Sequence, residues 1–104
     1  MPGFYVTNVP MYNYKEVGVV DRIQVERMQT GMRLEKRMVK VLKALAEYLD
    51  MTLGDLIEGI VLHAFDGKLP FNEKTLKKIK EIKKVYDMDL DSAHSHRLTE
   101  LKTK

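Results

Sequence analysis

The residues with the clearest potential for chemistry lie near the C-terminus, where three aspartates alternate with other residues. Asp87, Asp89 and Asp91 match the opening ligand positions of a calcium-binding loop. Such a loop also needs a glycine at its sixth position and a bidentate glutamate at its twelfth, where this chain has Ser92 and Leu98. The three aspartates therefore indicate an acidic tail and no calcium site.

Two histidines follow in the sequence SAHSH, beside the two serines of the chain. His94 and His96 have the spacing of a shared metal site, but two ligands without a third are typical of chance. Ser92 and Ser95 belong to no nucleophile motif, and the chain has no glycine-rich phosphate loop. The absence of cysteine excludes disulfides, thiolate zinc sites and cysteine nucleophiles. We therefore expect no enzyme, no metal and no cofactor.

Length and composition indicate one folded domain. The 104 residues suffice for a single modest core, and 44% hydrophobic with 32% charged residues is globular composition. No apolar run approaches the roughly 20 residues of a membrane span, and the N-terminus does not resemble a signal peptide. We expect a cytoplasmic protein with no membrane contact, which the lack of cysteine also fits.

Charge is segregated along the chain although the net charge is only +3. Residues 22–43 hold seven Lys/Arg and two Glu, a net of +5, whereas residues 44–67 hold five Asp/Glu and no Lys/Arg. Residues 68–84 return to +5 with seven Lys and two Glu. Basic blocks favour polyanion partners, although a solvated helix face is the commoner explanation of any single block.

Hydrophobic periodicity predicts an extended segment and then helices. Residues 19–34 alternate apolar and polar side chains in two registers, which predicts strand structure with a bulge or bend near Arg27. Apolar spacings of three and four predict helices over residues 35–49 and 53–65, and Thr52 is the expected N-cap of the second. The second helix is apolar around more than half of its circumference, so we expect a partner subunit to bury it.

A third helix is predicted over residues 73–86, capped by Asn72 and rich in lysine. The chain is thus divided into residues 1–20 as an irregular aromatic arm, 21–67 as the core unit, 68–86 as a basic third helix and 87–104 as a flexible tail. The lysine run of the third helix favours a solvated face over a membrane or nucleic-acid surface, since its apolar stripe is short and lacks Trp and Phe.

The central stretch TGMRLEKRMVKVLKALAEYLDMTLGDLIEGIVLHAF, within residues 29–65, resembles the ribbon-helix-helix family of DNA-binding proteins. The resemblance rests on a short strand ending in an Arg-hydrophobic pair, a helix of about four turns, a brief turn, a capping Thr and a very apolar second helix. It implies a mainly α fold with a short β-ribbon: a ribbon-helix-helix dimer with an N-terminal arm and an extra C-terminal helix. Two positions depart from the family pattern, since Asp50 replaces the usual turn glycine and Asp55 stands where a hydroxyl residue is common.

The resemblance also implies a function and its residues. Two chains would pair their strands, and the ribbon would read bases in the major groove of double-stranded DNA, as in a transcriptional regulator. The implied base-reading residues are Gln29, Gly31 and Arg33. The implied phosphate contacts are Arg27, Lys36, Arg37, Thr52, Leu53 and Gly54. The implied dimer core comprises Met32, Leu34, Leu42, Leu45, Leu56, Ile57, Ile60 and Val61.

An alternative of another class stays open on the sequence. The same helical homodimer is also suited to a protein-interaction or antitoxin-like module without sequence-specific DNA binding, with its acidic block toward a partner protein. Gly31, which offers no side chain for base reading, and the acidic turn favour this alternative. A monomeric bundle is a third possibility, if the N-terminal residues fold back over the second helix.

Overall fold

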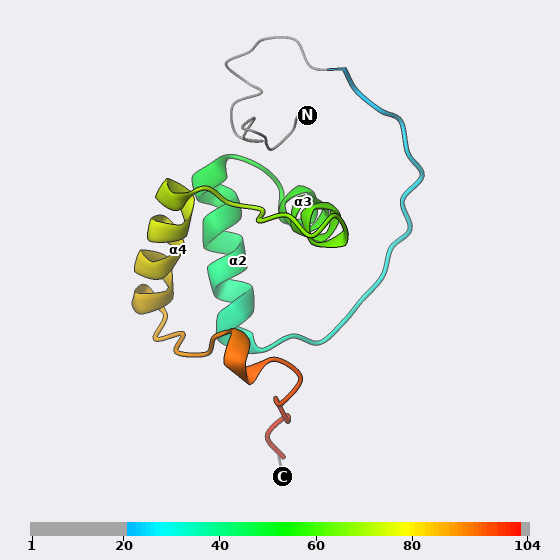
Figure 1. Cartoon of the computed structure of the whole chain (residues 1–104). Coiled ribbons are helices and arrows are strands. Elements are labelled where there is room, and N and C mark those ends of the chain that lie inside the picture. Colours follow the sequence, from blue (N-terminus) through cyan, green and yellow to red (C-terminus); the bar gives the residue numbers. More distant parts are fainter. Residues whose placement is uncertain (1–20, 103–104) are drawn as a thin grey trace.

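The structure, a computed structural model, describes residues 21–102, which contain three α-helices (Figure 1). One of the three lies between the other two. Helix α2 spans Lys36–Leu49, α3 spans Leu53–Phe65 and α4 spans Glu73–Val85. A short 3-10 turn, η2, follows at Ser92–His94. Helix α2 packs against both α3 and α4, so it is the centre of the fold. The expected aromatic arm at residues 1–20 lies outside the described residues.

Each helix begins at a side chain that accepts a hydrogen bond from a first-turn backbone amide. Glu35 Oε1 accepts from the Met38 amide at 2.8 Å, before α2. Thr52 Oγ1 accepts from the Asp55 amide at 3.0 Å, and Asn72 Oδ1 accepts from the Thr75 amide at 2.9 Å. These bonds satisfy amides that have no partner within the helix. The predicted caps Thr52 and Asn72 are confirmed.

The three helices also end in the same way. A residue with left-handed backbone follows each of them, with φ of 65° at Asp50, 68° at Gly67 and 53° at Asp87. The next amide then bonds back five residues, as Lys68 N does to His63 O at 2.9 Å. Corresponding bonds from residue 51 to 46 (3.0 Å) and from 88 to 83 (2.8 Å) close the other two helices. This closure reverses the chain sharply and satisfies late carbonyl groups.

The hydrophobic core is small and lies where α2 meets its neighbours. Leu45, Ala46 and Leu56 form its buried cluster. The partly buried side chains packed against it are Leu42, Leu49, Met51, Ile60, Phe71, Ile79 and Ile82. Of the helix α3 residues only Leu56 and Gly59 are buried, because α3 contacts the body along one side. Its opposite side leaves Leu62 and Phe65 with 62% and 80% of their surface exposed.

The residues expected to form a dimer core differ in how far the single chain buries them. Leu45 and Leu56 are buried, while Leu42, Ile57 and Ile60 are half-buried. Met32, Leu34 and Val61 are exposed, with 69%, 42% and 38% of their surface accessible.

The predicted β-ribbon is wrong, because the described residues 21–102 contain no β-strand. Residues 21–35 run as an extended chain that arcs away from the helices and has no neighbouring extended segment in the described part (Figure 1). Alternation of apolar and polar residues fixes which side chains share a face, but a strand exists only through hydrogen bonds to a neighbour. The mainly α part of the expectation is confirmed.

The C-terminal residues return to the start of α2, where η2 lies beside its first turn (Figure 1). No helix in the described part of the chain is both long and apolar enough to cross a membrane, and α2, with 14 residues, is the longest of them.

Candidate nucleic-acid interface

The extended segment, residues 21–35, presents its side chains to solvent along nearly its whole length. Every residue from 21 to 34 is exposed, and the segment ends at half-buried Glu35. It carries three arginines and two glutamines between its apolar residues. Guanidinium and amide groups are the side chains that bind phosphates and base edges most directly. The base-reading residues expected from the sequence, Gln29, Gly31 and Arg33, all lie on this exposed stretch.

Arg27 bridges the extended segment to α3. Its Nε and Nη2 donate to the two carboxylate oxygens of Glu58, each at 2.8 Å. This is the paired geometry in which a guanidinium binds a planar anion. The hydrogen bond from Arg27 holds the pKa of Glu58 below its usual range, and the same bond raises the pKa of Arg27. Both side chains are well exposed, at 66% and 47%, so solvent competes with the pair.

Arg33 makes the same kind of pair with the C-terminal segment. Its Nε donates to Glu100 Oε1 at 3.1 Å and its Nη2 donates to Glu100 Oε2. The hydrogen bond from Arg33 to Glu100 raises the pKa of the arginine. At 81% exposure, the Arg33 side chain is open to solvent on its other sides. Gly31, two residues earlier, has no atom within 4 Å of where a Cβ would stand.

The start of α3 lies close to Arg27. Thr52, Gly54 and Asp55 are exposed at this end, and Leu53 is half-buried. The charge of Asp55 contributes to the raised pKa of Arg27, which places the carboxylate within electrostatic reach of the guanidinium. Helix amides attract anions at an N-terminus, but Asp55 and Glu58 bring two negative charges to the same end. A phosphate at this end would meet that repulsion, so Arg27 is the stronger anion-binding group here.

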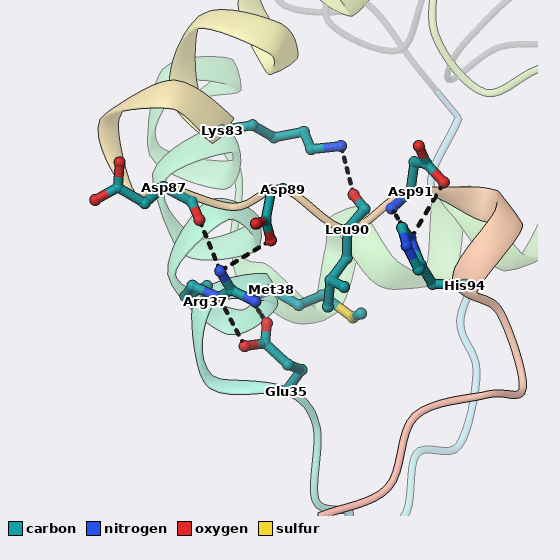
Figure 2. A network of polar contacts seen from close by, with 9 residues as sticks. All are labelled: Glu35, Arg37, Met38, Lys83, Asp87, Asp89, Leu90, Asp91 and His94. Carbon is teal, nitrogen blue, oxygen red and sulfur yellow. Dashed lines mark hydrogen bonds and ion pairs between the residues drawn. The ribbon is translucent and has the colours of Figure 1, made fainter.

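At the start of α2, Arg37, which was expected to contact phosphate, instead binds groups of the protein itself (Figure 2). Arg37 donates through Nε to Glu35 Oε2 at 2.9 Å. Its Nη1 donates to the Asp87 carbonyl at 2.7 Å and to Asp89 Oδ1 at 3.1 Å. Lys36, the neighbouring expected ligand, is exposed. Arg37 thus joins the first turn of α2 to the chain after α4, and Lys36 is the freer cation of the two for a phosphate.

Glu35 is the acceptor at the centre of this network (Figure 2). Burial of its carboxylate works against the charged form. Hydrogen bonds from Arg37 and from the backbone amides of Met38 and Arg37 outweigh that effect and lower the pKa of Glu35. The group is therefore a carboxylate at neutral pH, and its charge stabilises the junction.

The C-terminal segment, residues 87–102, contacts the helices through side-chain and backbone hydrogen bonds. Lys83 Nζ donates to the Leu90 carbonyl at 2.8 Å (Figure 2). Asp91 is the N-cap of η2, and its Oδ1 accepts from the Ala93 amide at 2.9 Å. The Asp91 amide in turn donates to His94 Nδ1 at 3.0 Å. That bond leaves the other ring nitrogen of His94 to carry the proton when the ring is neutral.

Sequence reasoning missed Glu58, Asp89 and Glu100 as partners of the arginines. A signal for the docked segment was present, since apolar Met88 and Leu90 alternate with Asp87, Asp89 and Asp91, and in the structure the two apolar residues are half-buried while the aspartates are exposed. That alternation has the period of a half-buried extended chain. No such signal identifies Glu58 or Glu100, because a pair between residues 31 or 67 positions apart depends on the fold.

The two histidines and two serines near η2 line a groove. The groove has a volume of about 350 Å³ and is lined by Met38, Met88, Leu90, Asp91, Ser92, His94, Ser95, His96 and Leu98. Within residues 21–102, no group of three His, Cys, Asp or Glu side chains is placed to hold a metal ion.

The expected DNA-contacting residues thus fall into two groups. Arg27 contacts α3 through Glu58 and lies within electrostatic reach of Asp55, in the helix that Thr52, Leu53 and Gly54 begin. Arg33, Lys36 and Arg37 lie near the start of α2 and the C-terminal segment. Gln29 and Gly31 lie on the extended chain between the two groups.

Comparisons with known proteins add no relative to this picture, since no family model, curated protein or solved structure matches the chain.

Proposed function

We propose that the chain is a DNA-binding protein, a regulator of transcription that acts as a dimer, and that the extended segment supplies its contacts to duplex DNA. The observation that carries the proposal is the presentation of two arginine forks, Arg27 and Arg33, on an exposed extended chain. An extended chain fits a DNA groove, and each fork offers the paired donors that bind guanine or a phosphate. Gln29, between them, has the amide that pairs with adenine.

The carboxylates of Glu58 and Glu100 support this proposal, because they occupy both forks in the free protein as an anionic ligand would. Both pairs are solvent-exposed and join surface groups. Exposed ion pairs contribute roughly 0 to 1 kcal/mol, so DNA can exchange with these carboxylates at small cost. Binding would replace each arginine–carboxylate pair with an arginine–DNA contact.

The test uses duplexes selected by the full-length protein from a random pool, with affinity measured by fluorescence anisotropy over a range of salt. Arg33→Ala is expected to weaken binding of the selected duplex by about 1 to 3 kcal/mol. Arg33→Lys keeps the charge but loses the paired donors, so it should keep the affinity for unselected duplex and lose the sequence preference. A wild-type protein with no salt-sensitive binding to any duplex would contradict the proposal.

A second candidate function is a helical protein-interaction module that does not read DNA. The exposed apolar side of α3 and the loop after it favour this candidate, since Leu62 and Phe65 on the helix and Leu69 in the loop are 62%, 80% and 82% exposed. Contiguous exposed apolar patches often mark the surface at which a protein binds another protein. Both candidates assume that the helical body self-associates. The DNA-binding candidate predicts that the Arg33 variants change the affinity for duplex DNA, whereas the protein-interaction candidate predicts no sequence-specific binding for them to change.

A further inference from the structure

Helix α4 carries a stripe of lysines on the side that faces away from the body. Lys74, Lys77, Lys80 and Lys84 are spaced by three and four residues, so they lie along one face of the helix. Thr75 is buried and Ile79 and Ile82 pack on the core, which puts the opposite face of α4 against α2. All four lysines of the stripe are exposed.

These lysines are not committed to the fold. In the described part of the chain none of the four lysine side chains makes a hydrogen bond or an ion pair. The other two lysines within the helix, by contrast, have structural partners. Lys78 pairs with Glu81 at 2.9 Å and lies over the Tyr48 ring, and Lys83 donates to the Leu90 carbonyl. Within residues 21–102 the four ammonium groups have no bonded partner, although Glu81 on the same exposed side feels the charges of Lys77 and Lys84, which help to lower its pKa.

The length and charge of the stripe match the backbone of a nucleic acid. Ten helical residues separate Lys74 from Lys84, a rise of about 15 Å. One strand of duplex DNA places a phosphate roughly every 3.4 Å along the axis, so about four phosphates lie beside four lysines. A membrane surface fits less well, because the stripe has no interleaved aromatic residue to enter the lipid.

Helix α4 and the extended segment lie on opposite sides of the described part of the molecule, with α2 and α3 between them (Figure 1). One straight duplex that lies along the extended segment therefore does not pass along α4. We propose that the α4 lysine stripe is a second surface for duplex DNA, which holds a different stretch of DNA from that bound by the extended segment. This inference rests on the proposed function in taking DNA as the ligand.

The test compares two triple variants of the full chain with the same change in charge. Lys77, Lys80 and Lys84 are replaced by Gln in the stripe variant, and the exposed Lys43, Lys68 and Lys102 are replaced by Gln in the control. The slope of log affinity against log salt should become less steep by about 2 to 3 in the stripe variant alone, since each phosphate contact contributes about 0.9. In a bridging assay, wild type should retain a labelled duplex on beads that carry a second duplex, and the stripe variant should not.

Each other outcome decides against one of the two proposals. An unchanged slope with retained bridging in the stripe variant, or equal losses in both variants, overturns the second surface and leaves the extended segment untouched. Loss in the stripe variant together with full binding by an Arg27→Gln, Arg33→Gln variant overturns the proposed function instead. Binding of the wild type to phosphatidylserine vesicles but not to duplex, lost in the stripe variant, assigns the stripe to membranes and overturns the inference.

Discussion

At the scale of single residues, the arginines of this chain divide by what they contact. Arg27 and Arg33 each hold one exposed carboxylate with a paired geometry, while Arg37 holds a carbonyl and two carboxylates. A guanidinium with several structural acceptors is costly to redirect, because all of those hydrogen bonds must be lost together. We therefore expect Arg37 to stabilise the fold and Arg27 and Arg33 to be available to a ligand.

Glu35 gives a pH-dependent prediction. Its pKa is lowered in the folded protein, so its carboxylate contributes stability above the unfolded value and that contribution is lost as pH falls through the folded pKa. Glu35→Gln should therefore lower the urea midpoint at pH 7 and should make stability less dependent on pH in the acid range. The measurement is urea unfolding followed by circular dichroism at neutral and acidic pH.

The matched control for this prediction is Asp21→Asn, which removes an exposed carboxylate at the far end of the extended segment. It should change neither the neutral midpoint nor the acid dependence. A Glu35→Gln protein whose stability falls with acid as steeply as that of wild type would show that the carboxylate is not charged preferentially in the folded state.

At the scale of elements, the prediction of the three helices from sequence is confirmed, and the prediction of a β-ribbon is wrong. The spacing of apolar residues and the caps Thr52 and Asn72 are local signals, and they give α3 at its observed bounds and α2 and α4 to within a residue at one end. The strand expected near Met32 depended on a partner outside the local sequence. The strand prediction is wrong because alternation alone does not supply a hydrogen-bonded neighbour, and the described residues 21–102 contain none for this segment.

For the candidate site, the sequence named the residues but did not predict their contacts within the fold. Arg27, Gln29 and Arg33 were named because they stand at positions that the resemblance to the ribbon-helix-helix family implies, and their contact with DNA stays a prediction. The use of Arg37 inside the fold could not be read, since it depends on Asp87 and Asp89 returning to α2 after about fifty residues of chain.

The cap of α3 gives the prediction at this scale. Thr52→Ala removes the acceptor of the Asp55 amide and should destabilise the protein by about 1 kcal/mol, whereas Thr52→Ser keeps the hydroxyl and should cost much less. Thermal or urea unfolding measures both. If Ala and Ser were equally destabilising, the methyl group of Thr52 would matter and the hydrogen bond would not.

At the scale of the whole molecule, the notable feature is how little of its apolar surface the chain buries by itself. Among the described residues only Val41, Leu45, Ala46 and Leu56 are buried hydrophobic residues, while large apolar side chains on α3 and on the extended segment remain exposed. Apolar area left in water contributes nothing to folding. A second copy of the chain would bury part of it, which is why the proposed DNA-binding form is a dimer.

The prediction at this scale concerns self-association. Replacing Leu62 and Phe65 together by Glu should raise the dissociation constant of the proposed dimer by at least about a hundredfold, because each buried side chain of this size is worth roughly 1.5 to 3 kcal/mol. Leu101→Glu is the control, since Leu101 is 87% exposed and lies on the C-terminal segment. Sedimentation velocity over a concentration series measures both. A wild-type protein that stays monomeric throughout would contradict the dimer.

The pair between Arg27 and Glu58 has a further consequence for what can bind the extended segment. Because the two groups belong to one chain, Glu58 faces Arg27 at an effective concentration on the order of millimolar, whatever the dilution of the protein. A free phosphate ion at a lower concentration competes poorly with that tethered carboxylate. A polymer of phosphates that engages Arg27 and Arg33 together gains the same intramolecular advantage after its first contact. Competition from the two carboxylates would thus make the extended segment selective for polymers of phosphate over single phosphate ions.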